Sequence, residues 1–348
     1  MSVTRAESVP ARNVTRTIIV AIALAAVAFV LWRVRGALIV GFGAIVFATV
    51  LRTLADLVRR VSGWSERISL SVAVALLLIL LGLLGWLFGA QTAEQFAELR
   101  ERLPEALHKF KAWVASLPGG ETAIETLKSA ANGDGGATSK LGGVASAILG
   151  GLGHLLLIVF AGIYFALDPA LYREGALRLL PPSRRPQVRE ALNDAGAHLR
   201  KWLVAQLIVM LAVGLLSGIG LAAIGVPLAL SLGLLVGVLE FIPVLGPIVA
   251  AVPGVLLAFA KGPETAVYAT LVYIAVQQIE SNLLTPLIQR WAVELPPVVG
   301  LLAIVACGLL FGVPGVLFAT PLAVVAMALV QHLYVEDTLE RGRRRRGG

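Results

Sequence analysis

Long stretches of the chain carry no formal charge, and their lengths give the first structural prediction. Residues 68–90 and 241–260 are uncharged over 23 and 20 residues, and residues 203–239 and 295–331 over 37 residues each. A helix needs roughly 20 apolar residues to cross the hydrocarbon core, so each 37-residue run is long enough for a folded-back pair of helical segments. The pattern predicts an all-α membrane protein with several spanning helices.

The N-terminal pattern predicts a tight helical hairpin. Two uncharged runs of 16 residues, 17–32 and 36–51, are separated by Arg33 and Arg35, whose side chains can reach the membrane interface. We expect this hairpin (17–51) and the span 68–90 to form the first transmembrane part of the chain. The first run follows the basic N-terminal tail almost at once, which favours an uncleaved span over a signal peptide.

Residues 91–140 form a different kind of segment. From Phe96 to Leu117, apolar residues recur every three or four positions, which predicts one apolar helical face outside the membrane. Pro104 suits the first turn of a second helix. An amphipathic hairpin on the membrane surface is the favoured interpretation, and a subunit contact or a lid over a pathway is the alternative.

Composition supports the membrane assignment. Of 348 residues, 58% are hydrophobic and 14% are charged, whereas a soluble domain is about half apolar and a quarter charged. These values exclude a water-soluble globule, and they exclude a disordered chain as well. The single cysteine, Cys307, excludes an intrachain disulfide and a cysteine-rich metal site.

Lysine and arginine predict the orientation. They gather in the N-terminal tail, in residues 52–67 and 168–202, and after Tyr334, whereas residues 91–140 are net negative. The positive-inside rule then places both termini in the cytoplasm and 91–140 outside. This arrangement accounts for most of the net charge of +8 without a nucleic-acid partner, although the basic tail can also contact acidic lipid headgroups.

We divide the chain into N-terminal transmembrane helices (1–90), the outside segment (91–140), a transmembrane helix with a cytoplasmic basic linker (141–202), a transport core (203–335) and a cytoplasmic tail (336–348).

Prolines and glycines interrupt the apolar runs of the transport core, which holds ten of the 17 prolines and only six charges. In hydrocarbon, a broken helical ladder survives only where it is buried in protein or lines a wet cavity. The densest break holds Glu240, Pro243, Gly246 and Pro247. We interpret it as the tip of a helix–break–helix hairpin, with Glu240 as a proton or cation carrier. An ordinary extramembrane turn with a hydrated Glu240 is the alternative.

A second polar group follows on one helix. At 100° per residue its amides and hydroxyls share one face, and Pro286 weakens the helical ladder in the same stretch. Uncharged polar groups can exchange hydrogen bonds with a small polar solute, so we favour a pathway, and polar contacts between helices are the alternative. The face holds Gln278, Asn282, Thr285 and Gln289, and Gln277, Glu280 and Ser281 lie on the neighbouring side.

Glycines four residues apart predict close contacts between helices. The pairs are Gly214 and Gly218, Gly233 and Gly237, and Gly308 and Gly312.

Enzyme motifs are absent from the sequence. There is no Gly-x-x-x-x-Gly-Lys loop, no His-Glu-x-x-His pair and no Gly-x-Ser-x-Gly elbow. We therefore expect no catalysis, no cofactor and no metal site, and energy coupling through an ion gradient or a partner.

Four motifs resemble the autoinducer-2 exporter family. They are Glu-Phe-Ile-Pro-Val-Leu-Gly-Pro at 240–247, Gln-Gln-Ile-Glu-Ser-Asn-Leu-Leu-Thr-Pro-Leu-Ile at 277–288, Leu-Pro-Pro-Val-Val at 295–299 and Phe-Gly-Val-Pro-Gly-Val at 311–316. The resemblance covers nearly the whole chain and implies a bacterial inner-membrane protein of about eight spanning or re-entrant helices. Some relatives export the quorum-sensing signal autoinducer-2, and others are associated with sodium/proton exchange. The family pattern places the pathway near Glu240, Pro243, Gly246, Gln278, Glu280, Asn282 and Pro286.

Three functions are open at this point. A gradient-driven exporter of a small polar solute such as autoinducer-2 is favoured, a sodium or other cation/proton antiporter is second, and a membrane scaffold is third. The partners implied are the solute, a monovalent cation and a proton, membrane lipids, and further copies of the chain in a homo-oligomer.

Overall fold

The computed structural model describes residues 32–86, 137–289 and 295–333, together with five isolated positions between 22 and 30. These residues form helices joined by short turns and contain no strand, so the predicted all-α fold is confirmed. Most of the first hairpin run, nearly all of segment 91–140 and the basic tail lie outside the described residues. The helices are α2 (Arg35–Ser62), α3 (Glu66–Trp86), α6 (Ala137–Leu167), α7 (Pro169–Arg178), η2 (Pro182–Arg184), α8 (Arg185–Ala223), α9 (Ala229–Leu239), α10 (Leu245–Lys261), α11 (Pro263–Ile279), η3 (Glu280–Leu284), α12 (Thr285–Gln289), α13 (Pro297–Phe311) and α14 (Val313–Val330).

The chain does not reverse direction where the N-terminal hairpin turn was expected. The Val34 amide donates to the Val30 carbonyl at 3.0 Å and the Leu38 amide donates to the Val34 carbonyl at 3.1 Å, so helical hydrogen bonding continues across residues 33–35. No glycine or proline stands at these three positions to end a helix. The helix ends instead at Gly63, whose φ of 70° closes α2 before α3 begins.

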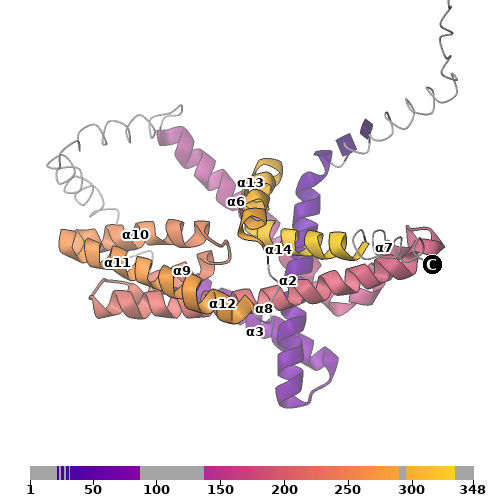
Figure 1. The fold of residues 1–348 in the computed structure, drawn as a ribbon, viewed down its shortest axis with the longest axis horizontal. Helices are drawn as coiled ribbons and strands as arrows, with labels where there is room; N and C mark the ends of the chain where they lie inside the picture. The colour runs from indigo at the N-terminus through magenta and orange to yellow at the C-terminus, as the bar shows by residue number, and fades with distance from the viewer. Residues whose placement is uncertain are drawn as a thin grey trace, which may run out of the picture.

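Helix α8 organises the described fold. It runs along the long axis of the molecule, with α9, α10 and α11 gathered around its C-terminal end and α2 and α14 beside its N-terminal half (Figure 1). Trp202 and Leu203 of α8 are buried in one apolar cluster with Ile39 of α2 and with Phe318 and Val324 of α14. The cluster joins the N-terminal and C-terminal helices to the middle of α8.

Helices α8 and α9 touch along their backbones, as the glycine spacing predicted. A Cβ atom added to Gly233 would stand 2.6 Å from both the Gly214 carbonyl oxygen and the Gly218 Cα atom. One added to Gly237 would stand 2.7 Å from the Met210 carbonyl oxygen. Because no larger residue fits at these positions, the glycines fix how closely the two helices pack.

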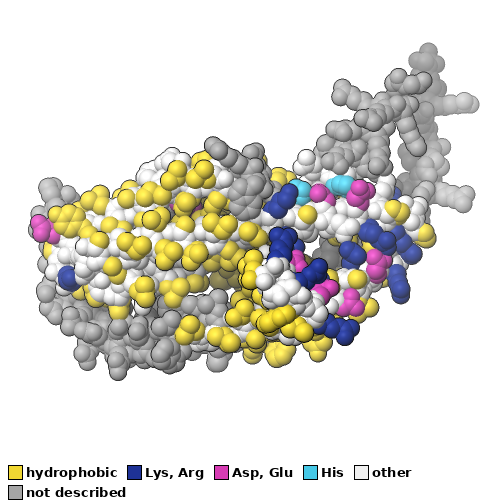
Figure 2. All heavy atoms as spheres, turned by 90° about the horizontal axis from the view of Figure 1, so that it is seen from below, with side chains coloured by type: hydrophobic (Ala, Val, Ile, Leu, Met, Phe, Trp, Pro, Cys, Tyr) yellow, Lys and Arg dark blue, Asp and Glu magenta, His cyan; other side chains and the backbone are white. Residues whose placement is uncertain are grey.

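The surface of the helical assembly matches a lipid environment. Among the residues that the structure describes, three helices are long and apolar enough to cross a membrane: Arg35–Ser62, Pro182–Ala223 and Val313–Leu333. A fourth span results if Gly153–Leu167 of α6 and Pro169–Arg178 of α7, bent by 89°, count as one. Large apolar side chains such as Leu211 and Ile219 are about two-thirds exposed, at 66% and 67%. Hydrophobic side chains cover one end of the molecule, and charged ones gather at the opposite end, around α7 and the first half of α8 (Figure 2).

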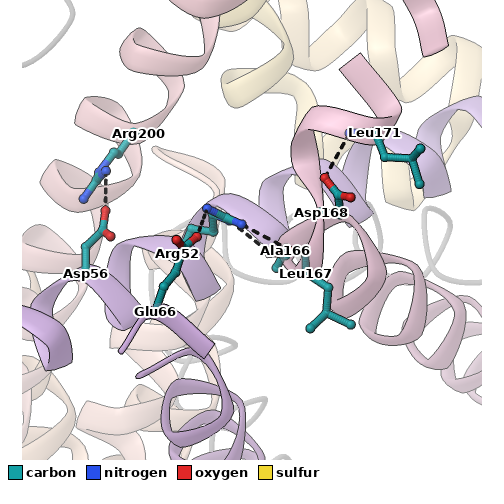
Figure 3. A network of polar contacts seen from close by, with 8 residues as sticks. All are labelled: Arg52, Asp56, Glu66, Ala166, Leu167, Asp168, Leu171 and Arg200. Carbon is teal, nitrogen blue, oxygen red and sulfur yellow. Dashed lines mark hydrogen bonds and ion pairs between the residues drawn. The ribbon is translucent and has the colours of Figure 1, made fainter. Parts of the chain in front are cut away.

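Ion pairs join several helices at the charged end (Figure 3). Arg52 of α2 pairs with Glu66 at 2.9 Å and donates from Nε to the Ala166 carbonyl, at the end of α6, at 2.8 Å. Arg200 of α8 pairs with Asp56 of α2 at 2.7 Å. These contacts fix α2 against α3, α6 and α8 at the level where the apolar parts of these helices end.

The backbone contact between α8 and α9 predicts the effect of one added methyl group. Gly233→Ala should lower the free energy of unfolding by about 1–3 kcal/mol, because the new Cβ would overlap backbone atoms that cannot rotate away. Denaturant unfolding of the purified protein in detergent micelles measures this loss.

Gly41→Ala is the matched control, because a Cβ there has no atom within 4 Å. It should leave stability unchanged or raise it slightly, since alanine favours helix. Equal stability of the two variants would contradict the proposed packing.

Candidate functional site

The break predicted at residues 240–247 is present between α9 and α10. Its centre is a tight turn in which the Leu245 amide donates to the Pro243 carbonyl at 2.9 Å. Val244 lies inside this turn with φ 72° and ψ −53°, a conformation that is rare and strained for a β-branched residue. Gly246 follows, and a Cβ there would stand 1.8 Å from the Leu239 carbonyl oxygen. The break is therefore a defined structure that requires glycine at position 246.

Glu240 caps the C-terminal end of α9 and is buried, with 1% of its surface exposed. Gln206 of α8 donates from Nε2 to the Glu240 carbonyl oxygen at 2.7 Å. The rings of Trp202 and Phe241 make an edge-to-face contact at 6.0 Å beside it. The Glu240 carboxylate oxygen Oε2 has no hydrogen-bond partner among the described residues. Glu240 is thus an enclosed acid and does not match the hydrated acid of an open turn.

Glu280 is the second acid of the site. It begins η3, a single wide turn of π-helix in which the Thr285 amide donates to the Glu280 carbonyl. Gln277 donates from its side-chain amide to the Glu280 carboxylate. Leu284, at the end of η3, packs in the same apolar cluster as Val236 and Leu239 of α9, the helix that ends at Glu240. The structure therefore joins two of the predicted site residues, Gln277 and Glu280, and packs η3 against the helix that ends at Glu240.

The π-helical turn has a cause in the sequence. Pro286 has no amide hydrogen to donate to the Asn282 carbonyl four residues earlier, so the regular ladder is interrupted at this point. π-helical turns are rare and occur frequently at functional sites. The weakening of the helical hydrogen bonds that the sequence predicted near Pro286 is therefore seen as the π-helical turn η3.

The remaining predicted residues lie around this centre. The Asn282 amide donates to the Gln278 side-chain oxygen at 2.8 Å, as residues on one helical face can. Both side chains are exposed and bond to each other. Three of the predicted residues are half-buried: Pro243, Pro247 and Thr285. Pro286 is exposed. Gln289 is the last residue of α12, and its side chain lies outside the described set, as does all of Arg290.

Sequence reasoning missed Gln206, Ser217 and Tyr273. Gln206 caps the carbonyl of Glu240, and the hydroxyl oxygens of Ser217 and Tyr273 are buried without a hydrogen-bond partner among the described residues. The available signal was a lone polar residue inside an apolar run. Across residues 32–86, 137–289 and 295–333, no three His, Cys, Asp or Glu side chains are grouped to hold a metal ion.

Long apolar helices, a broken helical pair and a buried acid at the break are typical of multi-pass membrane transport proteins. A family model described as "AI-2E family transporter" matches residues 18–335. The chain belongs to this family, which confirms the resemblance found in the sequence.

Several relatives carry provisional names as transport proteins. The chain is 30% identical to YueF and 32% identical to YrrI of Bacillus subtilis (strain 168), over 53% and 55% of its own length. It spans about half of these two proteins, 51% and 55%. It is 32% identical to MT0215 of Mycobacterium tuberculosis, over 74% of each chain. The family and these names support a role in membrane transport.

The hydrogen bond from Gln206 predicts a stability effect at the break. Gln206→Met keeps the length of the side chain but leaves the buried Glu240 carbonyl without this donor. The free energy of unfolding should fall by about 1–3 kcal/mol, the usual cost of a buried unsatisfied polar group.

Leu207→Met is the control, because it changes an exposed residue of the same helix. Both variants are compared by denaturant unfolding in the same detergent. A Gln206→Met protein as stable as the control would contradict the assigned contact.

Proposed function

We propose that this protein is a secondary transporter that exports a small polar solute, with Glu240 coupling export to an ion gradient. The observation that carries the proposal is the enclosed Glu240 carboxylate at the α9–α10 break, one oxygen of which has no hydrogen-bond partner among the described residues. A charged carboxylate surrounded by protein inside a membrane is costly unless it is neutralised. Binding of a proton or a cation neutralises it, so a change in the site's occupancy can drive a structural change.

The break suits this role because α9 is short. Its 11 residues extend about 16 Å, roughly half the thickness of the hydrocarbon core. We propose that α9 and α10 form a re-entrant hairpin whose tip is the strained turn at Val244. A strained turn between two short helices is a place where the backbone can rearrange at low cost.

Autoinducer-2 is the solute we propose. The amides of Gln278 and Asn282 lie exposed at the end of α11 and in η3, and they can exchange their mutual hydrogen bond for bonds to an uncharged polar molecule. The predicted orientation, with both termini in the cytoplasm, follows from the basic segments and the positive-inside rule, and the resemblance to the family implies that the membrane is a bacterial inner membrane.

The proposal predicts that the charge of Glu240 is required for export. Proteoliposomes loaded with autoinducer-2 and given a pH gradient should release it, and Glu240→Gln should reduce release to the level of protein-free liposomes. Asn282→Ala should also reduce release if the polar face contacts the solute.

Glu264→Gln is the matched control, an exposed acid in the first turn of α11, and it should leave release unchanged. Thermal unfolding confirms that each variant is folded. Unchanged release in both Glu240→Gln and Asn282→Ala would refute the assigned site.

Cation/proton antiport is the second candidate, and the presence of two acids, Glu240 at the end of α9 and Glu280 in η3, favours it. Two acids whose charges interact can bind one cation in exchange for protons. A sodium pulse to proteoliposomes containing a pH-sensitive dye should then move protons, and Glu280→Gln should abolish the signal. If sodium moves no protons at any pH tested, antiport is excluded.

A further inference from the structure

The turn between α2 and α3 carries positive charge that no described residue neutralises. Arg59 and Arg60 lie in the last turn of α2, and Arg67 lies in the first turn of α3. Only residues 63–65 separate the two helices, so the three arginines lie at the same end of the helical pair. All three are exposed, and none of their side chains forms a hydrogen bond or an ion pair with another described residue.

The acids of these two helices are already paired with other arginines. Asp56 and Glu66 are the only acids between residues 35 and 86. Arg200 of α8 pairs with Asp56 at 2.7 Å, and Arg52 pairs with Glu66 at 2.9 Å (Figure 3). Each acid is therefore balanced by an arginine that lies outside the turn, and the charge of the turn itself stays positive.

The helix ends do not balance all three arginines either. The C-terminal end of α2 is the negative end of its dipole and favours Arg59 and Arg60. Arg67 stands at the N-terminal, positive end of α3, where a cation is unfavourable. The Gly63 amide donates to the Arg59 carbonyl at 2.9 Å and closes α2, so the backbone that carries these charges has a defined shape. An anion from outside the chain would be attracted to this turn.

Large apolar side chains stand exposed beside the arginines. Val61 is 83% exposed, Leu57 is 60% exposed, and Trp64, between the two helices, is 50% exposed. Helix α2 is one of the candidate membrane spans, so the turn after it lies where the chain leaves the hydrocarbon. Tryptophan is enriched at this level of a membrane, because its ring is apolar and its N–H group is polar. Exposed arginine beside exposed apolar groups suits contact with lipid headgroups.

We propose that the α2–α3 turn binds the headgroup of an anionic phospholipid such as phosphatidylglycerol. The guanidinium groups of Arg59, Arg60 and Arg67 contact its phosphate, and Trp64 and Val61 pack against the upper part of its acyl chains. A guanidinium forms paired, charge-assisted hydrogen bonds with phosphate oxygens. Three of them favour a lipid with net negative charge over a zwitterionic one. Free phosphate matches the charge but not the apolar groups. The site does not depend on the proposed transport function.

The test uses the full chain in lipid nanodiscs and measures which lipid is enriched at the turn. In a Cys307→Ser background, Ser65→Cys carries a fluorophore at the turn. Phosphatidylglycerol or phosphatidylcholine, each with a nitroxide near the carboxyl end of one acyl chain, is added as the same minor fraction of the lipid. The nitroxide quenches the fluorophore only at short range, so the two quenching curves give the relative affinity. Phosphatidylglycerol should be preferred by about 5-fold or more, the effect of at least one charge at the membrane surface.

The variants assign the preference to the turn. Arg60→Gln and Arg67→Gln should each lower it by about 2- to 5-fold, and the triple variant that also carries Arg59→Gln should be quenched equally by both lipids. Arg178→Gln, the same change at an exposed arginine of α7, is the matched control and should leave the preference unchanged. Thermal unfolding confirms that each variant is folded.

A second label position separates the turn from the rest of α3. Leu83 is exposed and lies about 25 Å further along the helix. A fluorophore on Leu83→Cys should be quenched equally by the two lipids.

Three results would overturn the proposal. One is equal quenching by the two lipids at Ser65→Cys, and another is a preference that persists in the triple variant. The third is quenching by aqueous iodide but by neither lipid, because the turn would then lie in water.

Inorganic phosphate distinguishes a lipid from a free anion. Sodium phosphate should change the lipid preference no more than sodium chloride of the same ionic strength does. A preference lost in phosphate alone would mean that the turn binds free phosphate, which also overturns the proposal. No gradient is applied, so all these results can be interpreted even if the transport proposal fails.

Discussion

The close contact between α8 and α9 determines where the site lies. In lipid there is little hydrophobic force between helices, so association depends on close packing and on polar contacts. Gly214 and Gly218 on α8 face Gly233 and Gly237 on α9 with no side chain between the backbones. This contact holds the C-terminal end of α9 close enough to α8 for the Gln206 amide to reach the Glu240 carbonyl.

A short helix that ends in a buried place leaves backbone carbonyls to be satisfied. At the end of α9 this is done by Gln206 and by the tight turns through residues 241–246. The arrangement requires glycine at 246 and an unusual conformation of Val244. As a result the break is well defined, and it encloses the Glu240 carboxylate.

Local sequence features predicted the local structure well. Uncharged runs predicted membrane helices, glycine spacing predicted the α8–α9 contact, and clustered prolines with glycine predicted the break. Pro286 indicated a disturbed ladder, although the π-helical form depends on backbone relaxation that composition does not reveal. The turn expected at Arg33 and Arg35 was not found because charge alone does not end a helix. For Gln206, Ser217 and Tyr273 the sequence offered only the weak signal of a polar residue inside an apolar run. Their surroundings depend on contacts between distant parts of the chain; Gln206 and Glu240, for example, are 34 residues apart.

The central claim is that Glu240 is an acid enclosed by protein within the membrane. Labelling with two carbodiimides, followed by peptide mass spectrometry, tests it most directly. Dicyclohexylcarbodiimide enters apolar sites, whereas 1-ethyl-3-(3-dimethylaminopropyl)carbodiimide reacts with acids in contact with water. We predict that only the apolar reagent modifies Glu240, whereas the water-soluble reagent modifies the exposed Glu264. Modification of Glu240 by the water-soluble reagent at the same rate as Glu264 would contradict the claim.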